Sequence, residues 1–198
     1  MKSVETSKNI AVIEADRVVK TFKRSAKAVA RFRREVESLR RLEGIEGIPA
    51  LLEVSEPQLR LVMSRLPGDP ISASRPIADA VFVRLRQLVA VMMERGVARH
   101  SIPPRDVIVG PRGEVGLVDF ERVTLRGGRY DPLWRGACAI TRFHLLRLIG
   151  DEAPHLLSAS EARTLGVQRR LGDVYHALIL FRRRLRGGRP PGARRRER

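Results

Sequence analysis

One segment restricts the fold of this chain more than any other: GVARHSIPPRDVIVGPRGEVGLVDFE, residues 96–121. Gly96 ends a helical pattern, and a turn broken by prolines follows. Two short apolar runs, residues 107–109 and 115–118, flank Pro111-Arg112-Gly113, which predicts a β-hairpin. Asp106 precedes the hairpin and Asp119 follows it. Two carboxylates at the ends of one hairpin repel each other, so we expect a cation between them.

The residues before this segment predict four strands and one helix. Runs 9–14 and 17–22 are β-branched and separated by Ala15-Asp16, which predicts a tight hairpin, and residues 50–54 and 59–63 predict two further strands. A helix with Ser25 as its N-cap is expected between the two pairs. Its apolar residues recur at helical spacing until Gly44: Val29, Phe32, Val36, Leu39 and Leu42. Glu35 lies about 60° from the centre of that stripe and Glu37 about 140° away, so Glu35 is expected to face the sheet.

After a loop at residues 66–70, the pattern changes from strands to helices. Pro76 suits a first helical turn, and Gly96 a stop, for a helix with the buried stripe Ile77, Val81, Leu85, Leu88 and Met92. Residues 133–149 and about 159–185 are also predicted to be helical, the latter opened by a capping box from Ser158 to Glu161. Strands followed by helices indicate an α+β protein of two lobes, an N-lobe at 1–66 and a reduced helical C-lobe at 67–186.

The C-terminus carries much of the formal net charge of +17. The last 17 residues begin at Arg182 and hold nine Arg and one Glu, and from Gly187 to Arg198 the composition predicts a basic, disordered tail. This tail is either merely solvated or binds RNA, the ribosome or an acidic protein. Aromatic residues make up only 5% of the chain and none interleave with these arginines, which weakens a stacking-based model of single-strand binding.

Two features bear on location. The sequence has no run of 18 apolar residues, and its N-terminus lacks the order of a signal peptide, so we expect a cytoplasmic protein without a membrane segment. The single Cys138 can form neither an internal disulfide nor a zinc-binding cysteine cluster.

Taken in order, several of these motifs resemble those of the protein-kinase-like superfamily, over about residues 8–150. Arg17-Val18-Val19-Lys20 is similar to the strand that carries a phosphate-pairing Lys, and Arg34-Glu35-Val36 to the helix that carries its Glu partner. Asp119-Phe120-Glu121 resembles the Asp-Phe-Gly triplet. Small archaeal predicted Ser/Thr kinases and RIO-like atypical kinases are the most similar groups. The resemblance implies a two-lobed kinase-like fold, with a small antiparallel N-terminal sheet, one helix and a reduced helical C-terminal lobe.

The resemblance also implies a site for ATP and Mg²⁺. Lys20 and Glu35 would form an ion pair beneath a four- or five-stranded sheet, and Asp106 and Asp119 would hold the metal. Residues 61–68 look like the hinge on which adenine sits. The nucleotide would therefore contact Lys20 and Asp119 as well as three hinge residues, Met63, Ser64 and Leu66, where backbone groups make the hydrogen bonds.

The catalytic loop departs from the kinase pattern. Arg99, Ser101 and Asp106 occupy the positions of His, Asp and Asn. Ser101 cannot accept a proton at neutral pH as Asp would, and a positioned base is worth about 10²–10⁴ in rate. His100 or Glu121 could replace it. Alternatively, His100 is a loop residue that hydrogen-bonds backbone, and Glu121 is the partner of Arg99 or Arg122.

The segment that would cover the nucleotide departs as well. Residues 1–12 contain no Gly, although the kinase pattern uses Gly where backbone N–H groups approach phosphates. Either Ser7-Lys8-Asn9 form a non-glycine turn that binds weakly, or part of the first strand lies before Met1.

Three functions follow from these observations. The leading interpretation is an ATP-dependent phosphotransferase, an atypical Ser/Thr protein kinase with a degenerate catalytic loop that acts on an unknown protein substrate. The alternative is a pseudokinase, a nucleotide-binding scaffold that docks a partner through its Arg-rich surface. A nucleic-acid-binding protein of unrelated α+β fold leaves the ordered set Lys20, Glu35, Asp106 and Asp119 unexplained.

Overall fold

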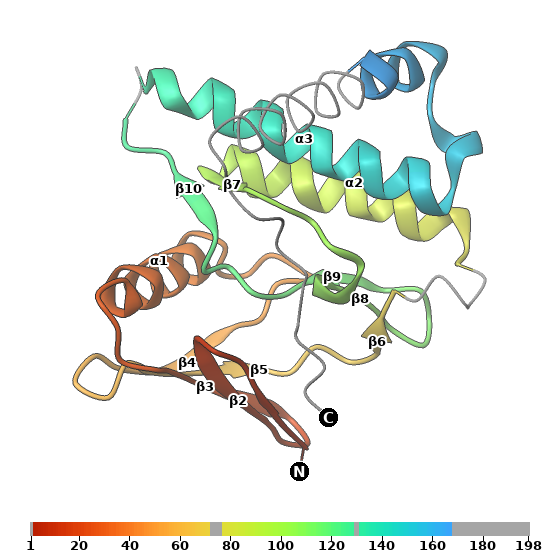
Figure 1. Ribbon diagram of the computed structural model, residues 1–198. Coiled ribbons are helices and arrows are strands. Elements are labelled where there is room, and N and C mark those ends of the chain that lie inside the picture. The colour runs from red at the N-terminus through yellow and green to blue at the C-terminus, as the bar shows by residue number, and fades with distance from the viewer. Residues whose placement is uncertain (1, 72–76, 129–130, 168–198) are drawn as a thin grey trace, which may run out of the picture. The chain divides into compact units, whose positions relative to one another are not determined.

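The computed structural model describes residues 2–71, 77–128 and 131–167 (Figure 1). Met1–Leu156 form one compact unit, and the residues from Leu157 onward belong to a second. Pro76, the predicted helix beyond residue 167 and the basic tail lie outside the described residues. The lobe boundaries predicted at 66 and 186 remain predictions.

Five antiparallel strands form the N-terminal sheet in the order β1-β2-β3-β5-β4. Their bounds are Lys2–Glu5 (β1), Asn9–Ile13 (β2), Arg17–Phe22 (β3), Leu51–Ser55 (β4) and Arg60–Ser64 (β5). The four predicted strands are confirmed, whereas β1 was not predicted. Residues 6–8 link β1 to β2 and contain no glycine, so Ser7 and Lys8 lie in a non-glycine turn, and its weak binding of phosphate stays a prediction. Lys20 lies on the central strand, opposite Ala11 on β2 and Leu61 on β5.

Helix α1 (Ala28–Arg41) packs against β4 and β10 (Val123–Leu125) (Figure 1). The prediction of Ser25 as N-cap was wrong: the N-cap is Lys27, and the Ser25 carbonyl accepts from Ala28 N at 2.9 Å while its hydroxyl accepts from Arg31. Val29 was also wrongly placed in the core, since it is 41% exposed. The buried face holds Ala28, Phe32, Glu35, Val36, Ser38 and Leu39. The true core face therefore includes Glu35.

Helices α2 (Asp79–Glu94) and α3 (Pro132–Glu152) form most of the second half of the unit. Gly96, at φ 77°, follows α2 as predicted, and all four predicted stripe residues from Val81 to Met92 are buried, although Ile77 is only half-buried. Asp131 caps α3 by accepting from Leu133 N and Trp134 N. Ser158 and Glu161 form the predicted capping box, at 2.9 and 3.2 Å, before residues 159–167, which are helical.

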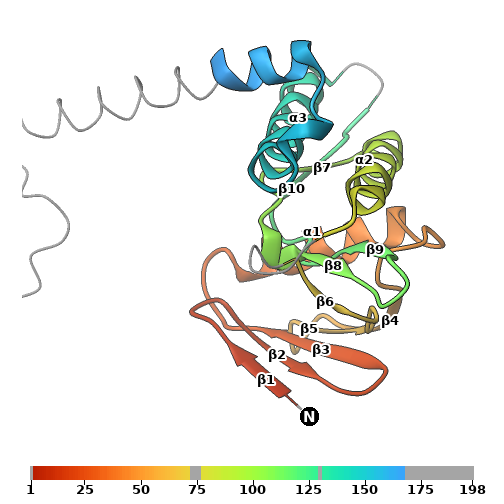
Figure 2. The same cartoon turned by 90° about the vertical axis from the view of Figure 1, so that its right-hand side faces the viewer.

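Short strands and 3₁₀ helices before, between and after α2 and α3 complete the fold. The predicted hairpin is present as β8 (Val107–Val109) and β9 (Val115–Leu117), with β6 (Asp69–Pro70) on its other side. Strand β7 (Val97–Arg99) pairs with β10, and short 3₁₀ helices cover Pro104–Asp106 and Pro154–Leu156. Figure 2 shows β6, β8 and β9 between the five-stranded sheet and α2. Among the described helices, none combines the length and apolar character needed to cross a membrane.

Two glycines, one before β4 and one directly before β6, let the backbone approach the β8-β9 hairpin closely. At Gly68, φ is 111° and a Cβ would lie 2.1 Å from the Val109 oxygen. At Gly47, φ is 84° and a Cβ would lie 2.2 Å from the Val115 oxygen, while its carbonyl accepts from Leu117 N at 2.9 Å. Only glycine fits either position, because both the left-handed backbone and the close approach exclude a side chain. These contacts fix the hairpin, and hence Asp106 and Asp119, relative to the sheet.

Candidate active site

A cavity of about 770 Å³ lies between the five-stranded sheet and the three-stranded β6-β8-β9 sheet. Apolar side chains form much of its wall, among them Ala11, Ile13, Val18, Met63, Leu66, Ile108 and Val118. Four charged groups predicted from the sequence also line it: Lys20, Glu35, Asp106 and Asp119. Apolar walls with a few convergent polar groups are typical of small-molecule sites.

Lys20 joins the sheet, the helix and the hairpin. Its Nζ donates to Glu35 Oε2 at 2.7 Å and Oε1 at 3.0 Å, and to Asp119 Oδ1 at 2.8 Å. The predicted Lys20–Glu35 ion pair is therefore present. Burial alone would lower the pKa of Lys20, but Glu35 and Asp119 together raise it well above its ordinary value. Lys20 thus remains a buried cation.

Asp119 has an unusual backbone conformation at the end of the hairpin. Its φ of 66° lies in the left-handed region, which costs a non-glycine residue about 1–2 kcal/mol. Strain of this kind concentrates at functional sites. Its side chain is 42% exposed. Burial alone would raise the pKa of Asp119, but Lys20 and Arg99 hold it below its ordinary value, so the carboxylate is ionised.

Asp106 is held by a buried arginine. Arg99 Nη2 donates to Asp106 Oδ2 at 2.7 Å, and the same guanidinium donates to the carbonyls of Ser101 at 3.1 Å and Val118 at 2.8 Å. It also lies 5.2 Å from the centroid of the Phe120 ring. Burial raises the pKa of Asp106 to about 6 in spite of Arg99. Arg99, at the kinase His position, therefore fixes one oxygen of Asp106.

His100, one of the two candidate replacements for the missing base, lies at a different cavity. The described residues that line the cavity include neither Ser101 nor His100. His100 is exposed in a second cavity of about 550 Å³, with Arg33 and Arg34, and its Nε2 lies 2.8 Å from Thr124 Oγ1. Its backbone N–H donates to the Arg122 carbonyl at 3.1 Å, so His100 does hydrogen-bond backbone, as one alternative had it, while its ring contacts a side chain. Burial, with Arg34 and Arg122, lowers the pKa of His100.

Glu121 replaces the glycine of the kinase triplet and is 3% exposed. Its Oε1 lies 3.4 Å from Lys8 Nζ, and its Oε2 accepts from Asn9 Nδ2 at 3.4 Å. The prediction of Arg99 or Arg122 as its partner was wrong. Arg34 instead reaches its backbone carbonyl, at 3.4 Å. Lys8 and Asn9 precede Glu121 by more than 100 residues, so local patterns could not identify this contact.

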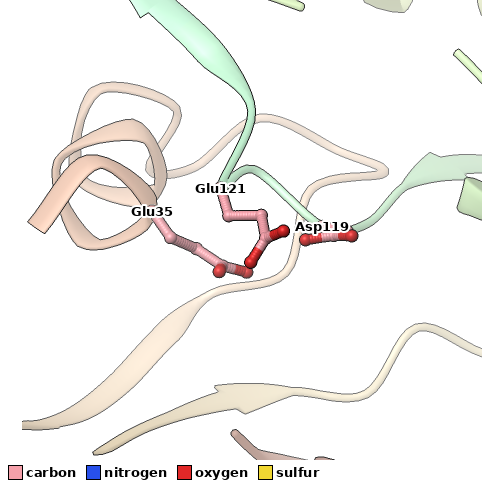
Figure 3. A group of neighbouring side chains, drawn as sticks. All are labelled: Glu35, Asp119 and Glu121. Atoms are coloured by element: carbon pink, nitrogen blue, oxygen red, sulfur yellow. The ribbon is translucent and has the colours of Figure 1, made fainter. Parts of the chain in front are cut away.

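Three carboxylates converge beside the cavity. One oxygen each of Glu35, Asp119 and Glu121 lies within 4.8 Å of the others (Figure 3). Glu35 comes from α1, and Asp119 and Glu121 come from the loop between β9 and β10. Lys20 and Lys8 supply the neighbouring positive charges. Sequence reasoning identified Glu35 and Asp119 but missed this role of Glu121, whose one visible signal was an acid at a glycine position.

The three predicted hinge residues Met63, Ser64 and Leu66 all line the cavity. Ser64 exchanges hydrogen bonds with Ala50, the residue just before β4: its Oγ accepts from Ala50 N at 2.8 Å and its N–H donates to the Ala50 carbonyl at 2.8 Å. Arg65 N donates to the Asp16 carbonyl at 2.8 Å. The segment is therefore a fixed wall of the cavity.

No family model and no curated protein matches this chain. Solved structures do. The Rio2 kinase of Chaetomium thermophilum, in an ADP/Mg²⁺-phosphoaspartate complex, is similar over 80% of this chain and 56% of its own, with 14% identity and a TM-score of 0.60. A 2.2 Å crystal structure of WbdD is similar over 75% of this chain and 37% of the WbdD chain, with 18% identity and a TM-score of 0.54. A medium-resolution structure of the bifunctional kinase-methyltransferase WbdD is similar over 81% of this chain and 47% of the WbdD chain, with 16% identity and a TM-score of 0.50.

This chain therefore spans between about a third and somewhat over half of the length of these chains. The similarity is one of fold. The predicted α+β kinase-like architecture, with an antiparallel N-terminal sheet and a helical second half, is confirmed.

Proposed function

We propose that this chain binds ATP with Mg²⁺ and transfers the γ-phosphoryl group to a Ser or Thr hydroxyl of a protein, as an atypical RIO-like kinase. The observation that carries this proposal is the position of Lys20. A buried lysine contacts Glu35 at 2.7 Å and Asp119 at 2.8 Å beside a cavity large enough for a nucleotide. A lysine that two carboxylates hold in one place is a suitable partner for phosphate oxygens.

The cavity offers a different environment to each part of the nucleotide. Val18, Met63, Leu66 and Ile108 present apolar surface that suits an adenine ring. Lys20, Asp106 and Asp119 present charge that suits the phosphates and their metal ion. The Rio2 kinase similar to this chain carries ADP and Mg²⁺, which supports the same pair of ligands here.

The residues present fit Mg²⁺. Asp106 and Asp119 both line the cavity and offer the carboxylate oxygens that this metal prefers. The pKa of Asp119 lies below its ordinary value, and that of Asp106, at about 6, leaves it mostly ionised at pH 7. Bound Mg²⁺ would neutralise phosphate charge. Lys20 would orient the phosphates, Glu35 would hold Lys20, and Arg99 would hold Asp106.

The test is calorimetric titration of the chain with ATP and Mg²⁺. We expect binding that depends on Mg²⁺ and is lost in Asp119→Ala, because this carboxylate lines the cavity, is ionised and is 42% exposed, whereas Arg99 holds one oxygen of Asp106. Asp16→Ala, at an exposed carboxylate outside the cavity, is the matched control and should bind like wild type. A wild-type chain that binds no nucleotide, or an Asp119→Ala variant that binds unchanged, would reject the proposal.

A second candidate is a pseudokinase, a nucleotide-binding scaffold without transfer that docks RNA, the ribosome or an acidic protein. Two observations favour it: Ser101 stands at the position of the base, and Arg99 already occupies one oxygen of Asp106. Both functions predict nucleotide binding. They differ in phosphate transfer, which an autophosphorylation assay with radiolabelled ATP measures directly.

A further inference from the structure

The β1–β2 turn lies at the cavity and has an unusual hydrogen-bonding pattern. Thr6 and Asn9 line the cavity. The N–H groups of Lys8 and Asn9 donate to Thr6 Oγ1 at 3.2 and 3.1 Å, and Thr6 N donates to the Asn9 carbonyl at 2.9 Å. Three backbone donors are thus used inside the turn. These three N–H groups are not open to a phosphate, so side chains are the charged donors that the turn can offer.

The turn offers two such side chains, and Glu121 holds both. Lys8 Nζ lies 3.4 Å from Glu121 Oε1, and Asn9 Nδ2 lies 3.4 Å from Oε2. Glu121 and Asn9 are buried, whereas the Lys8 side chain is 43% exposed. The same Glu121 carboxylate lies within 4.8 Å of the Asp119 and Glu35 oxygens, which contact Lys20. Lys8 and Glu121 do not themselves line the cavity, but Glu121 ties Lys8 to the end of the cavity where Lys20, Glu35 and Asp119 gather.

We propose that Lys8 binds the nucleotide phosphates in place of a glycine-rich backbone, and that Glu121 is the residue that positions Lys8 and the turn for this contact. This inference rests on the proposed nucleotide-binding function and names the residues that recognise the phosphates. A lysine is a point charge on a flexible stem, so without an anchor it would lose side-chain entropy on binding. Glu121 supplies that anchor before the nucleotide arrives.

The 3.4 Å separation fits this role. Strong charge-assisted contacts are closer, at about 2.7–2.9 Å, so the Lys8–Glu121 contact is loose enough for a more strongly charged phosphate to compete for the ammonium. Asn9 would remain on Glu121 and keep the turn in place. Lys23, just after β3, and Glu5 of β1 form an exposed ion pair that is separate from Glu121 and its carboxylate neighbours, and so provide a matched control.

The experiment compares the affinities for Mg²⁺-ATP and for adenosine in wild type, Lys8→Ala, Glu121→Ala, Glu121→Gln and the Lys8→Ala/Glu121→Ala double variant. We expect Lys8→Ala and Glu121→Ala to weaken Mg²⁺-ATP binding about tenfold, the size of one charge-assisted contact, and to leave adenosine binding within about twofold. Glu121→Gln keeps an acceptor oxygen and should lie in between. The double variant should be no weaker than Lys8→Ala, because both substitutions remove one contact. Lys23→Ala and Glu5→Ala should behave like wild type.

Several outcomes would overturn the inference. One is an unchanged affinity for Mg²⁺-ATP in Lys8→Ala, and another is tighter binding in Glu121→Ala, which would make Glu121 a source of repulsion. Equal loss of ATP and adenosine binding would indicate a merely structural role. If wild type binds neither ligand, the proposed function and the phosphate role of Lys8 fail together. Hydrogen exchange of the amides of residues 6–9 then still decides whether Glu121 anchors the turn, since exchange should be faster in Glu121→Ala.

Discussion

At the scale of single residues, Ser101 determines how much of the phosphotransfer chemistry this chain can perform. Lys20, Asp106 and Asp119 line one cavity, and these groups orient and neutralise phosphates. Removing the proton from the Ser or Thr hydroxyl of the substrate is a separate step that needs a base. The described cavity-lining residues do not include Ser101, and its known contact is a carbonyl that accepts from Arg99 Nε at 3.1 Å.

Introducing a base at this position tests the separation of binding from proton transfer. Ser101→Asp should raise the transfer rate by up to about 10²–10⁴ if the rest of the site is competent, while leaving the affinity for ATP nearly unchanged. Ser101→Ala is the control and should do little. Single-turnover transfer from radiolabelled ATP measures both. A scaffold without transfer chemistry would show no gain in Ser101→Asp.

Asp106 predicts a pH dependence of stability in the metal-free chain. Burial raises its folded-state pKa from 3.8 to about 6, so the folded chain holds this proton more tightly than the unfolded chain does. Its contribution to the unfolding free energy is therefore fully present below about pH 4 and is lost as the pH rises through 6. The loss amounts to at most about 3 kcal/mol. The unfolding free energy, measured by urea titration, should fall between pH 4 and 7, and it should fall less in Asp106→Asn. If it falls equally in wild type and Asp106→Asn, the prediction is contradicted.

At the scale of elements, the Lys20–Glu35 pair ties α1 to the central strand β3. Glu35 is 1% exposed and faces the sheet beside Phe32 and Val36. Phe32 also meets Phe22 of β3 edge to face, with ring centroids 5.8 Å apart. A buried charge on the core face of a helix therefore lies among apolar contacts that fix the same two elements.

Removing Glu35 should loosen this connection. We expect Glu35→Ala to lower the unfolding free energy by about 3 kcal/mol, the lower end for a broken buried ion pair, because Lys20 keeps Asp119 as a partner. Glu37, two residues further on α1, pairs with Arg41 at 2.9 Å on a half-exposed surface. Glu37→Ala should cost less than about 1 kcal/mol. Denaturant titration of both variants measures the difference, and equal losses would show that the Lys20–Glu35 pair does not stabilise the fold.

At the scale of the whole molecule, the charge is concentrated at one end of the chain. The nine arginines of residues 182–198 lie outside the described residues, so their binding of a polyanion stays a prediction. Counterion release makes the affinity of a basic segment for nucleic acid fall steeply with salt. A tail that cannot bury apolar surface should contribute little to stability.

Deleting residues 187–198 tests this segment. The salt dependence of RNA binding should become flatter, because five of the nine tail arginines are removed, while the melting temperature should stay nearly unchanged. Fluorescence anisotropy with a labelled RNA at several salt concentrations gives the slope, and calorimetry gives the melting temperature. An unchanged slope would exclude the deleted residues as the binding site.

The sequence alone determined the features that repeat over short distances. Alternating β-branched runs gave four of the five strands of the N-terminal sheet, and helical spacing turned Glu35 toward it. The apolar runs on either side of Pro111-Arg112-Gly113 gave the hairpin that ends at Asp119. Side-chain periodicity is a local property of the backbone, so a single sequence reveals it.

Contacts between distant residues were decided by the tertiary structure. Lys8 and Asn9 meet Glu121 across more than 110 positions, and Lys20 meets Asp119 across 99. The Arg99–Asp106 pair spans only seven, yet the polar Arg99 gave no sign that its guanidinium would be buried. The helical spacing also did not reveal that α1 begins at Ala28 or that Val29 is exposed. Which charges neutralise each other in a low-dielectric interior depends on their distance in space, and only the folded chain sets that distance.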